Sequence, residues 1–117
     1  MRDVGNRNRA DLRRGLEALK SDVAERRVPP EEMRGATITL SNFGVLGAGR
    51  FAALVVVPPQ VAIVGAGRIT PWPVAHEEAA VVHRMLPLSL TFDHRVVNGG
   101  EAARFLAAMI ANLARTD

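Results

Sequence analysis

The apolar positions near the beginning of the chain follow the period of a helix. Leucine and valine recur at intervals of three and four residues, as Leu12, Leu16, Leu19 and Val23. This spacing places the side chains on one helical face, and Asn8 is a residue type that caps a helix N-terminus well. We therefore expect a helix over about residues 9–27, ended by the prolines at 29 and 30 and followed by one further turn at Pro30–Met33.

The middle of the chain shows patterns that are typical of β-strands. Polar and apolar residues alternate over residues 37–41, which predicts a strand that ends at Ser41. The glycine-rich residues 42–49 predict a loop that contains tight turns or a close approach of two backbones. Two continuous apolar runs follow, at residues 51–57 and 61–64, and both predict buried strands.

Two further strands are predicted after a proline-rich turn. The turn is the Pro-Trp-Pro sequence at residues 71–73. The strands are residues 79–82 and 86–92, which form either a hairpin or one long bent strand. Pro87 restricts the second strand to a sheet edge or to its own first position, because proline has no N–H to donate.

A histidine follows the last predicted strand. The alternation that puts Leu88, Leu90 and Phe92 on one face also puts His94 on that apolar side. We therefore expect its imidazole to be partly desolvated. Beyond Glu101 an apolar stripe predicts a C-terminal helix, formed by Ala102, Phe105, Leu106, Met109, Ile110 and Leu113.

Composition limits the chemistry that the chain can perform. Its 117 residues suit one domain at most, and a hydrophobic content of 48% indicates a globular chain. The absence of cysteine excludes a disulfide framework, a zinc-thiolate site and a cysteine nucleophile, so any thiol chemistry must use substrate thiols. No apolar run approaches the about 20 residues of a membrane span and the first residues are polar, so we expect a cytoplasmic chain without a membrane partner.

Charge and histidine spacing argue against nucleic acid and metal. The net charge is +3, but the basic residues are spread along the chain and few aromatic residues lie among them, unlike a nucleic-acid interface. His76 and His83 do not have the helical spacing of a ligand pair, and no set of carboxylates completes a site. We expect both histidines on the surface, no bound metal and no nucleic-acid partner.

The residues around His94 allow two interpretations. A histidine at a strand-to-helix junction is well placed at the edge of a site. Alternatively, Asn98 and Glu101 form a capping box at the start of the last helix, and His94 is an incidental turn residue. Ser41 also has a simple explanation, since a serine at a strand end commonly makes local hydrogen bonds.

Three segments, taken together, resemble one family. They are residues 35–44, residues 58–69 and residues 85–100, and they occur in the order that the family has. The third segment includes the run Asp93-His94-Arg95-Val96-Val97-Asn98-Gly99-Gly100. The chain resembles the C-terminal part of the catalytic domain of dihydrolipoamide acyltransferases, the core components of 2-oxoacid dehydrogenase complexes.

The resemblance implies an α/β chain with a partial chloramphenicol-acetyltransferase-like fold, a mixed β-sheet with helices packed on it. It assigns residues 1–117 to the C-terminal portion of the acyltransferase catalytic domain, without a lipoyl or subunit-binding domain. The family's catalytic domain has more chain before the position of Met1, so the resemblance implies a truncated chain or a fragment.

The resemblance also implies a reaction and its residues. His94 is the general base, Ser41 donates to the oxyanion of a tetrahedral intermediate, and Asn98 supports the turn or donates a hydrogen bond in the transition state. Many relatives have aspartate where this chain has Asn98. Coenzyme A and a lipoyl group are the implied substrates, and the transferred acyl group can be acetyl, succinyl or branched-chain.

The implied assembly is a homotrimer or a larger core, with each active site between two subunits. Its implied partners are the thiamine-dependent 2-oxoacid decarboxylase and the dihydrolipoamide dehydrogenase components. Two alternatives stay open: a non-catalytic structural core fragment, and another acyltransferase of the same superfamily.

Overall fold

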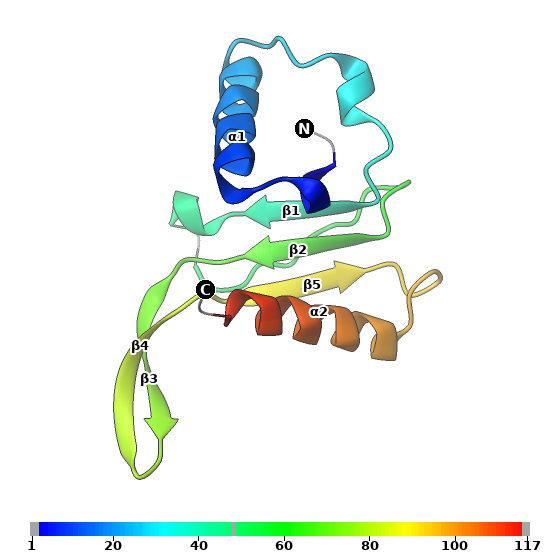
Figure 1. Ribbon diagram of the computed structural model, residues 1–117. Helices are drawn as coiled ribbons and strands as arrows, with labels where there is room; N and C mark the ends of the chain where they lie inside the picture. The colour runs from blue at the N-terminus through cyan, green and yellow to red at the C-terminus, as the bar shows by residue number, and fades with distance from the viewer. Residues whose placement is uncertain (1–2, 48, 116–117) are drawn as a thin grey trace. The chain divides into compact units, whose positions relative to one another are not determined.

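The computed structural model describes residues 3–47 and 49–115. Residues 1–35 and residues 36–117 form two compact units, which are described in turn (Figure 1). No helix within the described ranges is long and apolar enough to cross a membrane.

The first unit contains the predicted N-terminal helix. A short 3-10 turn, η1 (Val4–Asn6), precedes α1 (Arg9–Ala24), and a second 3-10 turn, η2 (Pro30–Met33), follows it. The Asn8 side chain accepts a hydrogen bond from the Asp11 backbone N–H at 2.9 Å, which confirms the predicted N-cap. The further turn at Pro30–Met33 is confirmed as well.

α1 ends three residues earlier than predicted. Arg26 has a left-handed φ of 54°, and the N–H of Arg27 donates to the Asp22 carbonyl at 2.7 Å while the N–H of Arg26 donates to the Val23 carbonyl at 3.1 Å. These two bonds form a Schellman motif, which satisfies the last carbonyls of a helix. Glycine usually occupies the left-handed position, so the arginine found there gave no signal of the helix end.

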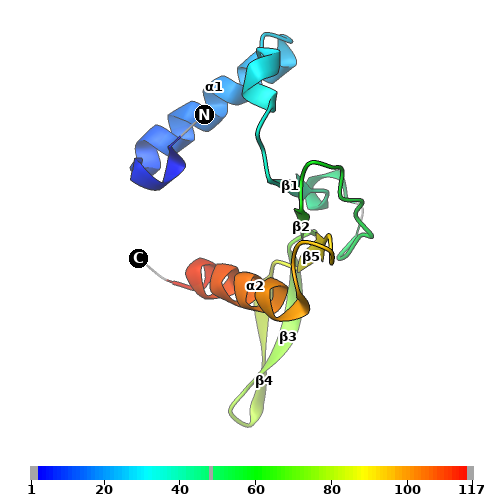
Figure 2. The ribbon, with the colours of Figure 1, turned by 90° about the vertical axis from the view of Figure 1, so that its right-hand side faces the viewer.

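A mixed sheet forms the centre of the second unit. Its order is β1 (Ile38–Asn42), β2 (Ala62–Ala66) and β5 (Leu88–Phe92), with β1 parallel and β5 antiparallel to β2. The helix α2 (Gly99–Leu113) lies along one face of the sheet beside β5 (Figures 1 and 2). The buried side chains Ala62, Val64 and Ala102 lie between β2 and α2, so the predicted mixed sheet with a packed helix is confirmed for this unit.

The remaining two strands form a separate hairpin, β3 (Thr70–His76) and β4 (Ala79–Met85), which extends away from the sheet (Figure 1). The predicted turn at residues 71–73 is wrong, because these residues lie inside β3. Pro71 and Pro73 fit there because alternate residues of an edge strand direct their backbone nitrogens away from the partner strand. The predicted pairing of residues 79–82 with 86–92 is also wrong, since β4 pairs with β3 while β5 pairs with β2.

The apolar run at residues 51–57 is not a strand, contrary to the prediction. It is an extended segment with alternating burial, in which Ala52, Leu54 and Val56 are half-buried. The Leu54 side chain lies over Gly65 of β2. Successive residues of a strand face opposite sides of the sheet. Val64 is buried on the side of α2, so Gly65 faces the other side, and this segment therefore covers the sheet face opposite α2. Its backbone pairs with no strand of the described residues, which is why its apolar composition misled the prediction.

Candidate active site

Ser41 is the fourth residue of β1 and lies on the sheet face opposite α2. It is half-buried and pairs in register with Gly65, which in turn pairs with Ser89 of β5. The strand continues through Asn42, one residue beyond the predicted end. Ser41 is therefore held in regular backbone next to the loop that follows β1.

The loop after Ser41 is fixed by contact between backbones. A Cβ atom on Gly44 would lie 2.3 Å from the carbonyl carbon of Gly67, and a Cβ atom on Gly67 would lie 2.1 Å from the carbonyl oxygen of Arg50. Neither separation can accommodate a side chain. The predicted close approach of backbones at the glycine-rich residues is thus confirmed at Gly44.

His94 lies in the turn that joins β5 to α2. Its imidazole is exposed, and its ring centroid is 5.5 Å from that of Phe92. The contact with Phe92 agrees with the predicted apolar side. The predicted partial desolvation is wrong, because the strand ends at Phe92 and the turn carries His94 out into solvent.

Asp93 organises this turn. Its N–H donates to the Val61 carbonyl at 2.9 Å, and its carbonyl accepts from the N–H groups of Val96 and Val97, both at 3.0 Å. Its Oδ1 accepts the Arg95 N–H at 3.0 Å, and the Arg95 guanidinium binds the carboxylate from Nε at 2.9 Å and Nη2 at 2.6 Å. The side-chain hydrogen bonds from Arg95, together with its backbone N–H, lower the pKa of Asp93 to about 2. The carboxylate is therefore ionised throughout the neutral range.

Asn98 closes the turn and caps α2. Its Oδ1 accepts the Glu101 N–H at 3.0 Å, and the Glu101 carboxylate accepts the Asn98 N–H at 2.9 Å. The capping-box interpretation is therefore confirmed for Asn98. Among the described residues nothing accepts from its Nδ2 group, which leaves that amide donor open to a ligand.

Ser41 and His94 do not meet within one chain. One row of paired residues crosses the sheet through Ile38, Ala62 and Phe92. Along the strand direction, Ser41 lies three residues from this row on one side, and His94 lies two residues from it on the other side. At about 3.3 Å per residue this separates them by roughly 15 Å along the strands. A site that uses both residues therefore requires a second copy of the chain.

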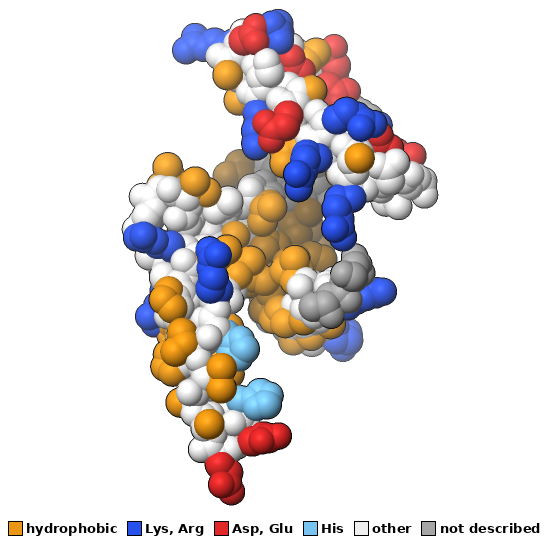
Figure 3. All heavy atoms as spheres, turned by 60° about the vertical axis from the view of Figure 1, so that its left-hand side comes forward, with side chains coloured by type: hydrophobic (Ala, Val, Ile, Leu, Met, Phe, Trp, Pro, Cys, Tyr) orange, Lys and Arg blue, Asp and Glu red, His pale blue; other side chains and the backbone are white. Residues whose placement is uncertain are grey.

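His76 and His83 lie on the hairpin and are exposed, as predicted. No group of three or more metal-binding side chains occurs in the part of the chain that the structure describes. Apolar side chains are also exposed along the same hairpin (Figure 3), including Val81, Val82 and Met85.

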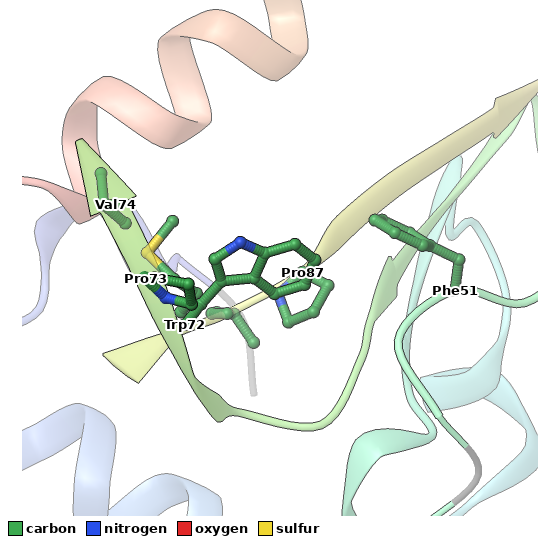
Figure 4. A pocket seen from close by; sticks show the side chains of 7 residues that line it. Phe51, Trp72, Pro73, Val74 and Pro87 are labelled. Atoms are coloured by element: carbon green, nitrogen blue, oxygen red, sulfur yellow. The ribbon is translucent and has the colours of Figure 1, made fainter. Parts of the chain in front are cut away.

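An apolar hollow at the base of the hairpin was not expected from the sequence. Phe51, Trp72 and Pro87 line it (Figure 4). The Arg50 guanidinium stacks 3.8 Å from the centre of the Trp72 ring. Trp72 was expected in a turn, so its sequence context gave no sign of this surface. Only strand formation by residues 70–76 sets the indole beside Pro87.

Solved structures share this fold. A dihydrolipoamide acetyltransferase from Azotobacter vinelandii, studied for the roles of a serine, a histidine and an asparagine in its catalytic mechanism, superposes with a TM-score of 0.81 at 33% identity, over 93% of this chain and 44% of that one. The cubic core of the pyruvate dehydrogenase multienzyme complex gives a TM-score of 0.76 at 34% identity, over 87% of this chain and 42% of that one. The fold is that of acyltransferase catalytic cores, of the chloramphenicol-acetyltransferase-like class.

The family follows from the sequence match. The model of the 2-oxoacid dehydrogenases acyltransferase (catalytic domain) matches residues 1–116, and the chain belongs to this family. The lipoamide acyltransferase component of the branched-chain alpha-keto acid dehydrogenase complex from Pseudomonas aeruginosa is 44% identical over 102 residues, which are 87% of this chain and 23% of that protein. The chain thus spans about a quarter of the length of the curated relatives that it matches.

Proposed function

We propose that this chain takes part in acyl transfer between dihydrolipoamide and coenzyme A, with His94 as the general base. The observation that carries the proposal is the exposed imidazole at the junction of β5 and α2, in a chain that matches the acyltransferase family over residues 1–116. The histidine and asparagine of the Azotobacter vinelandii protein are four positions apart, as His94 and Asn98 are here. That relative also supports asparagine, in place of aspartate, as compatible with the reaction.

The proposed reaction moves an acyl group from one sulfur to another. The neutral imidazole of His94 accepts the proton of one substrate thiol. The resulting thiolate forms a bond to the carbonyl carbon of the other substrate's thioester, and the carbonyl electron pair moves to oxygen. Collapse of this tetrahedral intermediate breaks the original carbon–sulfur bond, and the departing thiolate takes the proton back from His94.

Two further groups stabilise the intermediate. The Ser41 hydroxyl donates to the oxyanion, a contribution of about 3 kcal/mol in other enzymes. Asn98 anchors the turn through its capping box and has Nδ2 available as a second donor. The chain itself has no cysteine, which fits direct transfer between two substrate sulfurs.

The proposed active site lies between two copies of the chain, within a homotrimer or a larger core. The separation of Ser41 from His94 along the sheet supports this arrangement. Apolar side chains of the second unit also lie open to contact with another chain: Leu40 is 71% exposed and Val55 is 79% exposed. The thiamine-dependent 2-oxoacid decarboxylase and the dihydrolipoamide dehydrogenase are the proposed partners, and the cytoplasm is the proposed compartment.

We further propose that residues 1–117 correspond to the C-terminal portion of the catalytic domain. The share of the solved chains that is covered, 42% and 44% for the two structures above, supports a match to part of such a domain. The C-terminal placement rests on the resemblance of residues 35–44, 58–69 and 85–100 to that part of the family's domain. A purely structural role within such a core is the second candidate function, and the exposed apolar surface favours it as much as it favours assembly of an active enzyme.

Transfer from acyl-coenzyme A to dihydrolipoamide by the purified chain tests the proposal. We expect His94→Ala to lower the rate by at least about a hundredfold, because a general base contributes a factor of about 100 to 10,000. His83→Ala is the matched control, since His83 is also exposed but lies on β4. Acetyl-, succinyl- and branched-chain acyl-coenzyme A, compared side by side, identify the acyl group.

Full activity of His94→Ala contradicts the assignment of the base. If neither the chain nor any variant transfers acyl groups, while sedimentation shows that the chain self-associates, the structural role is supported instead.

A further inference from the structure

The carboxylate of Asp93 closes a ring around the backbone of His94. Its Oδ1 accepts the N–H of Arg95 at 3.0 Å, two residues further along the chain. This hydrogen bond is an Asx turn, in which an aspartate or asparagine side chain takes the place of a backbone carbonyl. His94 is the residue that the turn encloses, so its backbone angles are restricted by the Asp93 side chain.

We infer that Asp93 is a positioning residue for the proposed base, because its side chain sets the direction in which the imidazole of His94 leaves the end of β5. The inference rests on the proposed function of His94. Asp93 need not touch a substrate in this role, since it acts through the turn.

The backbone of Asp93 cannot provide this positioning by itself. Its N–H bond to Val61 and its carbonyl bonds from Val96 and Val97 are available to almost any residue at position 93. These bonds hold the two ends of the turn, whereas the Asx turn acts between them, at His94. Only a side chain with an acceptor oxygen close to the backbone can form it.

Arg95 holds the carboxylate in the orientation that the Asx turn needs. Its guanidinium forms a two-point contact, with Nε on Oδ1 and Nη2 on Oδ2, which restricts rotation of the carboxylate. The Arg95 side chain is 84% exposed, whereas that of Asp93 is 20% exposed. Because exposed ion pairs contribute little, we assign the larger effect to the Asx turn and a smaller one to the ion pair.

The consequence for catalysis is geometric. The turn keeps the imidazole beside Phe92, with ring centroids 5.5 Å apart. A base displaced by about 1 Å from the substrate thiol can lower the rate by about a hundredfold. Loss of the Asx turn is therefore expected to lower kcat and to change KM little.

Three variants separate the turn from the charge. Asp93→Ala removes both, Asp93→Asn keeps the acceptor oxygen and loses the charge, and Arg95→Ala keeps the Asx turn and loses the ion pair. We expect kcat to fall by about ten- to a hundredfold in Asp93→Ala and by about two- to fivefold in the other two, with KM for both substrates within about twofold of the original. The matched control is Asp22→Ala. Asp22 lies on α1 and its carboxylate is paired with the Arg27 guanidinium at 3.2 Å, so its loss removes a similar ion pair and should leave kcat unchanged.

Proton NMR of the imidazole reports the position of His94 without any substrate. The chain has three histidines, so comparison with His94→Ala identifies the His94 signals. The ring of Phe92 should shift these signals away from those of an unstructured histidine. We expect Asp93→Ala to abolish the shift and Asp93→Asn to retain it.

Two results would overturn the inference: a kcat and a His94 shift in Asp93→Ala that equal those of the unchanged chain, or a loss in Asp93→Asn as large as in Asp93→Ala. If Asp93→Ala does not fold by circular dichroism, Asp93→Ser replaces it. Serine forms the same kind of turn more weakly, so we expect its kcat to lie below that of Asp93→Asn, and a kcat equal to that of the unchanged chain overturns the inference. Full activity of His94→Ala contradicts the proposed base alone, because the NMR shift still tests whether Asp93 holds the turn.

Discussion

At the scale of single residues, the two polar atoms of the Asn98 side chain serve different purposes. Oδ1 accepts the Glu101 N–H and caps α2, while Nδ2 has no acceptor among the described residues. One side chain can therefore stabilise the helix and still offer a donor to a reaction intermediate. Variants of Asn98 that lose only one of these two atoms separate the two purposes.

Asn98→Ala removes the cap, and we expect it to lower the free energy of unfolding by about 1 kcal/mol. Asn98→Asp retains the capping oxygen and adds a charge that favours a helix N-terminus, so its stability should equal or slightly exceed that of the unchanged chain. The aspartate lacks the Nδ2 donor, and kcat should fall by about tenfold or more if that donor contacts the oxyanion. Urea unfolding and the transfer assay measure the two effects.

Unchanged kcat in Asn98→Asp would assign Asn98 to the cap alone. Equal loss of stability in Asn98→Asp and Asn98→Ala would contradict the capping role.

At the scale of secondary-structure elements, close backbone contacts fix the loops at the Ser41 end of the sheet. Gly67 follows β2, and its N–H donates to the Pro87 carbonyl at 2.9 Å, just before β5 begins. The same glycine contacts the backbones of Gly44 and Arg50. The segment that leaves β1 and the segment that covers the sheet are thereby held against the end of β2.

Gly67→Ala should break this contact. The new Cβ atom would meet the Arg50 carbonyl oxygen at 2.1 Å, and backbone atoms cannot rotate away as a flexible side chain can. We expect a loss of about 1–3 kcal/mol in the free energy of unfolding, measured by urea denaturation. Gly99→Ala is the matched control, because its Cβ atom meets nothing within 4 Å at the first position of α2; it should not destabilise the chain. Equal stabilities of the two variants would contradict the packing at Gly67.

At the scale of the whole molecule, the candidate site is divided. Ser41 and His94 lie at opposite ends of the same sheet, so neither end can form the proposed site alone. Repeated head-to-tail contact between identical chains can bring one end of each sheet to the other end of the next, and it closes into a ring when the rotation permits. The open apolar side chains of β1 and of residues 51–57 provide surface for such contact.

Mixing two impaired variants tests this division. His94→Ala keeps Ser41, and Ser41→Ala keeps His94. If each site takes one residue from each of two neighbouring copies, random co-assembly of equal amounts restores both residues at about a quarter of the sites. We expect the co-refolded mixture to regain about that share of the transfer activity, measured against each variant refolded alone. No recovery, despite mixed assembly shown by mass spectrometry, would contradict a site shared between copies.

Sequence periodicity was a good guide wherever a structure depends on neighbours within one or two turns. The apolar spacing from Leu12 to Val23 and the cap at Asn8 predicted α1, and Asn98 with Glu101 predicted the start of α2. Strand alternation placed Ser41 correctly on β1. These features are encoded within short windows, because helix caps and strand faces are set by residues only a few positions apart.

Pairing between distant segments was decided by the tertiary structure. Residues 51–57 are as apolar as a buried strand, yet β2 already has β1 and β5 on its two edges, so the segment lies across the face instead. β4 likewise pairs with β3, a pairing that Pro71 and Pro73 permit because β3 is an edge strand. The sequence by itself determined the helices, their N-terminal caps and the residue types of the candidate site. Only the tertiary structure decided which strands pair, how far Ser41 lies from His94 and how exposed the imidazole is, since each depends on contacts between residues far apart in the chain.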